Sequence, residues 1–393
     1  MQAKISHSGW HSYHAHRSSA TIALNALPLG ETNLMAELAR KTERIAKHVL
    51  WAIIRLFSSK KKSPPLPINF TSVSSVLVIR PDRLGDVVLS TPVYESIKKS
   101  FPHLRVSAVV SRSNVPILTN NPNVDEIIPF DLKNLGTTIK QLRHNRFDIA
   151  FTLNKKFSAI ASLLALISKA KYKIGYAHDE TTWLYDVRLP IGNQHHHESL
   201  NNLELLNHVG LAISSKSPRL YFSKDEEKKI TTMLNTLRKY PELPLVLIKP
   251  GTRIEKWGWE TENFQIVAER LSISKKAEVL FICGPGEEPL INRINKRGNP
   301  KIDRLPILLI KELALAIKKS DLLFCNHTGI MHFASAVETP VVVIFKHGET
   351  ERWGPINIPH ILLEEKNSDT LSPEIVLSKI NQLLTNIPDR KTI

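Results

Sequence analysis

The sequence predicts an α/β protein in two similar halves, each built on a parallel sheet with helices on both faces. Strand-like and helix-like patterns alternate after residue 71, and the alternation begins again after residue 243. Such alternation is typical of parallel sheets, because the helices that connect their strands cover both faces. At 393 residues the chain also exceeds what one hydrophobic core usually serves, so two domains are expected.

Each element is predicted from the spacing of apolar residues. Short apolar or β-branched runs predict buried strands, and apolar residues three or four apart predict helices. The first half has strand patterns at 73–80, 105–111, 124–130 and 148–153, and helix patterns at 85–101 and 132–145. The second half has strand patterns at 245–251, 277–284, 302–306, 321–326 and 340–345, and helix patterns at 263–274, 287–297, 310–320 and 330–338.

The same patterns divide the chain into four segments. A charged helical pattern near 225–243 connects the halves and marks the domain boundary. The segments are a basic N-terminal extension with an amphipathic helix and linker at 1–70, a first α/β domain at 71–235, a second α/β domain at 236–370 and a C-terminal helix at 371–393. That last helix either closes the second domain or crosses back to the first.

The composition is that of a soluble globular protein, with 42% apolar and 23% charged residues. The two cysteines, Cys283 and Cys325, lie far apart in apolar stretches, which fits a reducing compartment and gives no disulfide framework. The net charge is +16, and residues 1–65 carry +7 of it, because ten Lys and Arg stand there against three Glu. Such an arm suits nucleic acid or an anionic membrane surface.

Within this arm, apolar residues recur at helical spacing between Leu34 and Leu56, opposite a basic face. The most apolar stretch, 48–57, is about half as long as the roughly twenty residues that a membrane span needs. The helix either lies in a membrane interface, with the lysines at 60–62 on lipid phosphates, or packs on its own domain. The N-terminal residues show no signal-peptide pattern, so a cytoplasmic location is expected.

Ligands of open α/β sheets bind beyond the carboxyl ends of the strands, so the residues after each strand carry the functional information. After the first strand, Gly85 permits a tight turn and Asp86 stands at the start of the next helix. Asp86 is either an exposed catalytic carboxylate or only a helix cap. Asp82 and Arg83 have no assignable role. This junction has no G-x-G-x-x-G, and the chain has no P-loop, which argues against a nicotinamide, flavin or P-loop nucleotide site.

Two junctions of the second half suit phosphate groups. After the strand at 245–251, four residues gather near a Gly-containing turn, namely Lys249, Thr252, Arg253 and Lys256. They either contact phosphate oxygens or form a solvated loop. After the strand at 321–326, the backbone amides of Thr328, Gly329 and Ile330 stand at a helix N-terminus, which attracts anions. Two phosphate-binding junctions facing a carboxylate describe a nucleotide-sugar transferase better than a hydrolase.

The consecutive histidines in the stretch 194–200 do not indicate a metal site. Neighbouring side chains on a strand or helix point apart, and no cysteine or spaced histidine pair accompanies them.

Several stretches carry a family resemblance. "VLVIRPDRLGDVVLSTPVYESIKKSFP" resembles the opening of glycosyltransferase family 9, the heptosyltransferases of lipopolysaccharide assembly. "DLLFCNHTGIMHFASAVETPVVVIF" and the later "ERWGP" resemble the donor-binding segment of that family. "HESLNNLELLNHVGL" and "LFICGPGEE" also match in kind and order, so the similarity extends over residues 73–365.

The resemblance implies a GT-B fold, with two Rossmann-like domains facing a cleft, the acceptor in the first and ADP-heptose in the second. It also implies inversion at the anomeric carbon without a metal or another cofactor. Matched by position, Asp86 is the catalytic base. Together with the junctions above, the predicted donor-binding residues are Thr252, Arg253, Lys256, His327, Thr328, Gly329, His332 and Lys346. The predicted acceptor-binding residues are Asn154, Lys155 and Lys156.

The chain departs from the family pattern in its donor half. Lys256 is one position out of register, His327 replaces the usual aspartate, 346–348 replaces a Gly-Pro-Thr loop, and 259–260 replaces Trp-Pro. These departures bear on the identity of the donor more than on the reaction class. A histidine cannot accept hydrogen bonds from adenosine as a carboxylate does, but with Lys346 it would add positive charge against a diphosphate. The alternatives are that His327 is a tolerated loop residue, or that the enzyme has lost activity.

Two hypotheses follow. In the preferred one, the protein is an inverting glycosyltransferase that lies peripherally on the inner face of a bacterial inner membrane and extends lipopolysaccharide core or another lipid-linked surface glycan. In the rival one, it is a non-catalytic or nucleic-acid-binding protein, which the basic arm permits. The chain shows no readable nucleic-acid module and no stacking aromatics among its basic residues, so a nucleic-acid partner is not predicted.

Overall fold

The fold is described from a computed structural model of the chain. It describes residues 63–179, 181, 183–192, 196–346, 349–365 and 371–386. Residues 1–62, which include the amphipathic helix that the sequence predicts in the basic N-terminal extension, lie outside the described residues.

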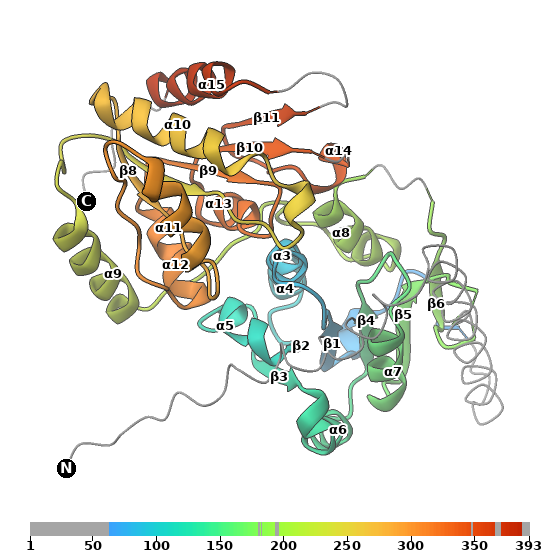
Figure 1. The fold of residues 1–393 in the computed structure, drawn as a ribbon. Helices are drawn as coiled ribbons and strands as arrows, with labels where there is room; N and C mark the ends of the chain where they lie inside the picture. Colours follow the sequence, from blue (N-terminus) through green and yellow to red (C-terminus); the bar gives the residue numbers. More distant parts are fainter. Residues whose placement is uncertain are drawn as a thin grey trace, which may run out of the picture. The chain divides into compact units, whose positions relative to one another are not determined.

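The first half contains a six-stranded sheet with the order β3-β2-β1-β4-β5-β6 (Figure 1). Every neighbouring pair of its strands is parallel, as the sequence predicts. The order reverses between β1 and β4, so the loops that follow these two strands diverge there and leave room for a ligand. The strands are β1 (Ser75–Ile79), β2 (Arg105–Ser111), β3 (Glu126–Phe130), β4 (Ile149–Thr152), β5 (Tyr172–Tyr176) and β6 (Val187–Leu189).

The second half contains a five-stranded sheet with the order β11-β10-β9-β7-β8, and its neighbouring strands are also parallel. Its strands β7, β9 and β10 are fully buried, and all their residues except Lys249 and Asn326 at the ends of β7 and β9 are apolar, the pattern expected of a sheet covered on both faces. The strands are β7 (Leu245–Lys249), β8 (Glu278–Phe281), β9 (Leu322–Asn326), β10 (Val341–Phe345) and β11 (His360–Glu364).

Helices alternate with the strands. In the first half they are α3 (Leu84–Leu89), α4 (Thr91–Ser100), α5 (Val115–Leu118), α6 (Leu135–His144), α7 (Ala159–Ile167) and α8 (Glu198–His208). The connecting helix is α9 (Lys224–Leu237). In the second half they are α10 (Thr261–Ile273), α11 (Glu288–Arg297), α12 (Ile310–Lys318), α13 (Met331–Val337), α14 (Thr350–Trp353) and α15 (Pro373–Thr385). The sequence patterns missed α5, α7, α14, β5, β6 and β11. The strand predicted at 302–306 is wrong, because only an isolated bridge from Arg304 to Phe281 forms there.

The single helix predicted at 85–101 is two helices that meet at Ser90. Pro92 has no N–H to donate to the carbonyl of Val88, and the hydroxyl of Thr91 donates to that carbonyl instead, at 2.8 Å. The short α3 therefore ends after six residues, and its first turn remains at the carboxyl end of β1.

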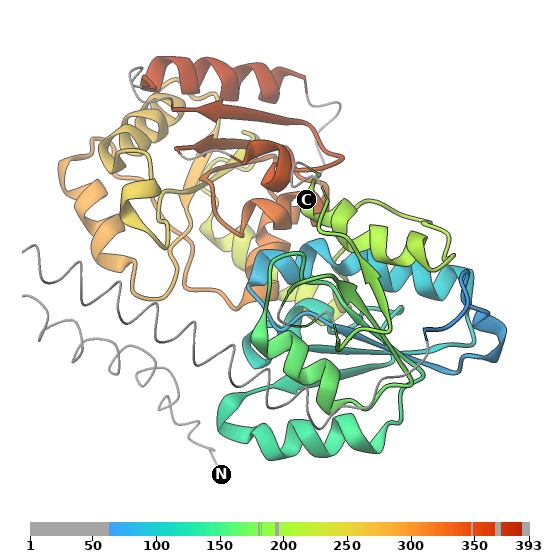
Figure 2. The same ribbon diagram turned by 90° about the vertical axis from the view of Figure 1, so that its right-hand side faces the viewer.

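Two apolar layers enclose the first sheet. On one face, residues of α3, α4 and α8 pack in a cluster that includes Val87, Val93 and Leu203. On the other face, Leu142 of α6 and Leu164 of α7 pack in a separate cluster. Figure 2 shows α6 and α7 together on this second face.

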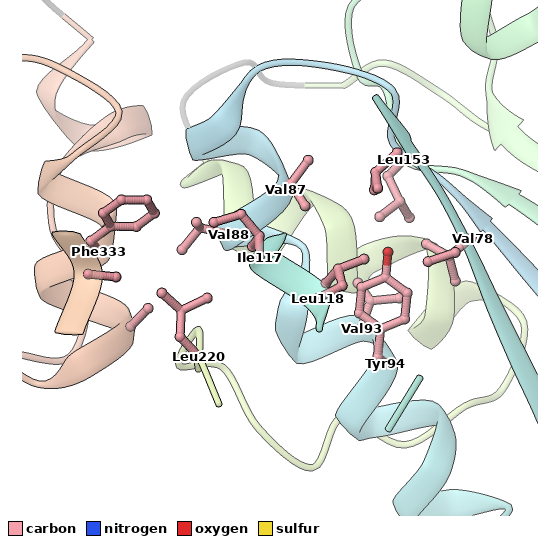
Figure 3. Close-up of a cluster of buried hydrophobic side chains, with 14 of the residues drawn as sticks. Val78, Val87, Val88, Val93, Tyr94, Ile117, Leu118, Leu153, Leu220 and Phe333 are labelled. Carbon is pink, nitrogen blue, oxygen red and sulfur yellow. The ribbon is translucent and has the colours of Figure 1, made fainter. Parts of the chain in front are cut away.

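The first of these clusters continues into the second half. Phe333 of α13 and Leu220 of the segment before α9 belong to the same buried cluster as Val88 of α3 (Figure 3). The two halves therefore share apolar contacts where α3 meets α13, beside the ends of their central strands.

The C-terminal helix packs on the second half. Val376, Ile380 and Leu383 of α15 are buried in the cluster that also contains Val267 of α10. Figures 1 and 2 show α15 running beside α10. No helix in the described part of the chain combines the length and the hydropathy needed to cross a bilayer.

Candidate active site

Loops that follow the central strands of the two sheets form the candidate site. In the first half these strands are β1 and β4, which are neighbours. In the second half they are β7, β9 and β10, which are neighbours in turn. Because carboxyl ends of parallel strands share one edge of a sheet, the predicted residues of each half gather at one edge.

Asp86 lies where the two halves touch. A Cβ atom on the preceding Gly85 would lie 2.6 Å from the ring of His332 and 3.4 Å from the Cα atom of Gly329. A glycine is therefore required at position 85, since the start of α3 packs directly on the loop before α13. The sequence separates Asp86 from this loop by more than 240 residues, and the fold makes them neighbours.

The Asp86 carboxylate is held by Arg80. Arg80 Nη2 donates to Asp86 Oδ1 at 3.0 Å and to Glu198 Oε1 at 2.8 Å, while Nη1 donates to the carbonyl of Leu153 at 2.8 Å. The α3 N-cap is Arg83, and no side chain caps this end. The interpretation of Asp86 as only a helix cap is therefore wrong, because its carboxylate is engaged by an arginine.

Arg80 is buried, with only 2% of its surface exposed. Burial lowers the pKa of its guanidinium, but the carboxylates of Asp86, Glu198 and Asp82 raise it by more, so the group stays charged. The buried guanidinium of Arg80 is thus a fixed positive charge in hydrogen-bond contact with the Asp86 carboxylate.

Glu198 links this cation to the second half. Its Oε2 accepts from Nε and Nη2 of Arg352, at 3.1 and 2.9 Å. Burial raises the pKa of Glu198, but Arg80 and Arg352 lower it by more, so the carboxylate is ionised between two arginines. Sequence reasoning did not single out Arg80, Glu198 or Arg352, because nothing in the local patterns shows that they meet.

His197 makes a second connection between the halves. Its Nδ1 accepts from the amide of Ser199 and caps α8, and its Nε2 lies 2.8 Å from the carbonyl of Gly354. Burial lowers the pKa of this imidazole.

In the part of the chain that the structure describes, no group of three His, Cys, Asp or Glu residues could hold a metal ion.

A second acid, Asp82, lies beside Asp86. Its Oδ2 accepts from the side-chain amide of Asn154 at 2.6 Å and lies 3.3 Å from Nε of Arg80. Burial raises the pKa of Asp82, which Arg80 partly offsets. Asp82 is thus the acid to distinguish from Asp86 in any test of the catalytic base.

In the second half, Asn326 joins two of the predicted phosphate-binding junctions. This residue ends β9 and is fully buried. Its Oδ1 accepts from the amide of Trp259 at 2.9 Å, and its Nδ2 donates to the carbonyl of Pro250 at 2.7 Å. The loop after β7 and the loop after β9 are therefore fixed to each other.

The loop between β9 and α13 carries unpaired polar atoms. The hydroxyl oxygen of Thr328 and Nδ1 of His332 are buried and have no hydrogen-bond partner in the described structure. Backbone amides of Met331, His332 and Phe333 donate to the carbonyls of Thr328, Gly329 and Ile330, so the loop closes as a tight turn onto α13. Burial, with smaller contributions from His197 and His327, lowers the pKa of His332 to about 3, so its ring is neutral.

His327 and Lys346 do not present free positive charge in this structure. Burial lowers the pKa of His327 to about 4, and its ring stacks on Phe345 with centroids 4.1 Å apart. Lys346 Nζ lies 3.0 Å from a carboxylate oxygen of Glu260 and 3.3 Å from one of Glu365. The expectation that these two residues together add positive charge is therefore not met here.

The four predicted phosphate-binding residues on and before the loop after β7 differ in burial. Lys249 is buried and contacts both carboxylate oxygens of Glu287 at 2.6 Å. Thr252 donates its hydroxyl hydrogen to the carbonyl of Ile254 at 2.6 Å. Arg253 and Lys256 are exposed, and Lys249 forms an internal ion pair with Glu287.

The predicted acceptor residues follow β4 but differ in exposure. Asn154 donates to Asp82, and the buried Lys155 donates to the side chain of Asn201 at 2.9 Å. Lys156 is exposed, and its Nζ lies 3.9 Å from a carboxylate oxygen of Glu349. Of the two lysines, only Lys156 is exposed.

A family model described as "Glycosyltransferase family 9 (heptosyltransferase)" matches residues 136–379, more than half of the chain. The chain belongs to glycosyltransferase family 9. This family 9 enzyme is therefore a glycosyltransferase, and the family predicted from the sequence is confirmed.

Curated relatives cover most of this glycosyltransferase. Lipopolysaccharide heptosyltransferase 3 of Escherichia coli strain K12 is 25% identical over 287 residues, which are 69% of this chain and 82% of the relative. Lipopolysaccharide core heptosyltransferase OpsX of Haemophilus influenzae is 24% identical over 304 residues, which are 74% of this chain and 84% of the relative.

Solved structures support the fold of the family 9 enzyme. A glycosyltransferase family 9 protein from Veillonella parvula has a TM-score of 0.74 at 20% identity, covering 83% of this chain and 100% of that chain. ADP-heptose lipopolysaccharide heptosyltransferase II of E. coli has a TM-score of 0.68 at 19% identity, covering 79% of this chain and 98% of that chain. The predicted GT-B fold with two Rossmann-like domains is confirmed.

We expect Glu198→Gln to destabilise the enzyme by about 3–5 kcal/mol, because it leaves Arg80 and Arg352 buried without their shared carboxylate. The matched control is Glu349→Gln, since Glu349 lies 3.7 Å from the same Arg352 but is half-exposed. The control is expected to cost less than about 1 kcal/mol. Urea unfolding measures both free energies, and equal losses in the two variants would contradict the role given to Glu198.

Proposed function

We propose that the enzyme transfers a heptose or a related sugar from a nucleotide-sugar donor, ADP-heptose, to a lipopolysaccharide-core or other lipid-linked surface-glycan acceptor. The relatives support the substrate class, since both named curated proteins are lipopolysaccharide heptosyltransferases. A further structural neighbour is an E. coli heptosyltransferase with ADP, with a TM-score of 0.65. The observation that carries the proposal is the contact of Gly85 with His332, which brings Asp86 to the predicted donor loop.

In the proposed reaction the Asp86 carboxylate accepts the proton of an acceptor hydroxyl. The hydroxyl oxygen forms a bond to the anomeric carbon as the bond from that carbon to the diphosphate breaks, and the electron pair leaves with ADP. A single displacement of this kind inverts the anomeric carbon. The proposed reaction requires no metal.

The proposed donor-phosphate contacts lie on two loops that Asn326 holds together. Arg253 and Lys256 supply exposed cations, and the hydroxyl of Thr328 is a buried donor that has no partner in the described structure. Such fixed donors stabilise charge that develops on the departing phosphate, where preorganisation is most effective.

Asp86 is a better candidate for the base than Asp82. Asp82 is bound to Asn154 at 2.6 Å within the first half, whereas Asp86 follows the glycine that touches the donor loop. Arg80 Nη2 lies 3.0 Å from Asp86 Oδ1 and fixes the position of that oxygen.

Replacing Asp86 with Asn is expected to lower kcat by roughly 10²- to 10⁴-fold, because the amide keeps the shape but cannot accept the proton. The KM for the donor is expected to change little. The measurement is ADP release and glycan transfer with purified acceptor. Asp82→Asn is the matched control, and a larger loss in that variant would assign the base to Asp82 instead.

His327 is proposed to set donor preference. Its neutral ring stands at the position where the family pattern has an aspartate, so the loop lacks a carboxylate acceptor for donor hydroxyl groups.

His327→Asp is therefore expected to change the ratio of kcat/KM between ADP-heptose and other nucleotide sugars by roughly tenfold or more, the usual effect of a hydrogen bond to a charged group. The exposed His360 provides a control, as His360→Asp. If the ratio of kcat/KM between the donors is the same in the wild type and in His327→Asp, this position does not contribute to donor selectivity.

We also propose that the basic N-terminal arm holds the enzyme peripherally on the inner face of a bacterial inner membrane. The arm's charge of +7 over residues 1–65 supports this proposal. Removal of residues 1–62 is expected to weaken binding to anionic vesicles at least tenfold, if each lysine or arginine at the surface contributes about 1 kcal/mol. Equal binding of both forms in a sedimentation assay would exclude this role of the arm.

A further inference from the structure

The outer layer of the first half is unusually basic. Between residues 132 and 178, nine lysines and arginines stand against a single acid, Asp148. The cations are Lys133, Lys140, Arg143, Arg146, Lys155, Lys156, Lys169, Lys171 and Lys173. This segment contains α6 and α7, which contact each other and cover the face of the first sheet opposite α3 and α8.

Seven of these cations are exposed, namely Lys133, Lys140, Arg143, Arg146, Lys156, Lys169 and Lys171. The acids on neighbouring elements are already engaged. Asp148 accepts from Ser74 and Ser75, Asp131 pairs with Arg112, and Glu126 pairs with Arg105. The α6–α7 face is defined here as these two helices and their end residues. Lys156 lies 3.9 Å from a carboxylate oxygen of Glu349, but Asp148, Asp131 and Glu126 are engaged elsewhere, so most of the positive charge of this face is not cancelled by adjacent carboxylates.

The same face exposes aliphatic side chains. Leu132, before α6, is 67% exposed, and Ile160 and Leu163 on α7 are 41% and 38% exposed. Ile160 and Leu163 are three positions apart, so they lie on one side of α7. Lysines flank this side at both ends of the helix, Lys156 before it and Lys169 after it.

We propose that the α6–α7 face docks on an anionic lipid bilayer. Aliphatic side chains ringed by lysine and arginine match a membrane interface, where the apolar groups enter the acyl boundary and the cations contact lipid phosphates. Nucleic acid would use the cations but gains nothing from exposed leucine and isoleucine. The α6–α7 face consists of other residues than the N-terminal arm, and vesicle binding by it requires no particular donor or acceptor.

The position of Lys156 connects this face with the chemistry of the site. Lys156 lies in the loop between β4 and α7, three residues before the start of α7. A lipid-anchored acceptor would reach that loop from the bilayer bound by the same helix. This last step rests on the proposed function, whereas bilayer binding does not.

The first test places a reporter on the face of the full-length chain. The two native cysteines, Cys283 and Cys325, are buried and therefore react little. Leu163→Cys is labelled with an environment-sensitive fluorophore, and Ile273→Cys, at a 65% exposed position of α10, is the matched control. On vesicles of phosphatidylglycerol and phosphatidylethanolamine, the label at 163 is expected to shift to the blue and the label at 273 to stay unchanged.

The second test removes the charge. Lys140→Glu with Arg143→Glu is expected to weaken partitioning to these vesicles by roughly tenfold or more. Lys275→Glu with Lys276→Glu changes the net charge equally on exposed residues of the second half, and is expected to have little effect.

Three outcomes would overturn the proposal. They are an unshifted label at 163, equal losses in the two charge variants, and a label at 163 that responds to single-stranded RNA but not to vesicles. Because the assays contain no donor or acceptor, their failure leaves the proposed transfer reaction intact. Conversely, loss of transfer in the Asp86 variant would not affect vesicle binding.

Discussion

The site depends on one buried carboxylate held between two arginines. Glu198, at the start of α8, accepts from Arg80 of the first half and from Arg352 of the second. An ionised group in this position is tolerated because both cations are in place, and each arginine would lose its most deeply buried carboxylate partner without it. Arg80 also fixes Asp86, so the same ion cluster joins the two halves and positions the proposed base.

Much of the fold and part of the site could be predicted from sequence, because both follow from strand ends. Apolar runs locate the strands, and parallel topology places their carboxyl ends together. Residues after neighbouring strands of one sheet, such as Thr252 and Thr328, therefore gather at one edge, whereas the meeting of Asp86 with the second sheet's loops comes from the packing of the two halves. The elements missed, such as α7 with its run of apolar residues, lack the polar face that makes a helix readable.

The sequence could not predict which side chains pair with the basic residues of the candidate site. Lys249 and Lys155 look like ligand-binding residues by position, yet one pairs with Glu287 and the other with Asn201, both more than 35 residues away. The neutral state of His327 likewise comes from burial against Phe345, which no local pattern reveals. Whether a basic residue can bind a ligand anion depends on pairing with residues far away in the sequence, and this pairing is set by the fold.

These pairings reduce the number of basic residues in the second half that can bind a diphosphate through their charge. Lys249 and Lys346 are matched by carboxylates, and His327 and His332 are neutral, so four of its basic residues add little net positive charge. The exposed cations at these strand ends are Arg253 and Lys256 on the loop after β7. That loop is fixed to the β9 loop through Asn326. We therefore propose that the loop after β7 recognises the phosphate charge, and that the loop after β9 contributes uncharged hydrogen bonds from Thr328 and its backbone, beside the carboxylate of Asp86.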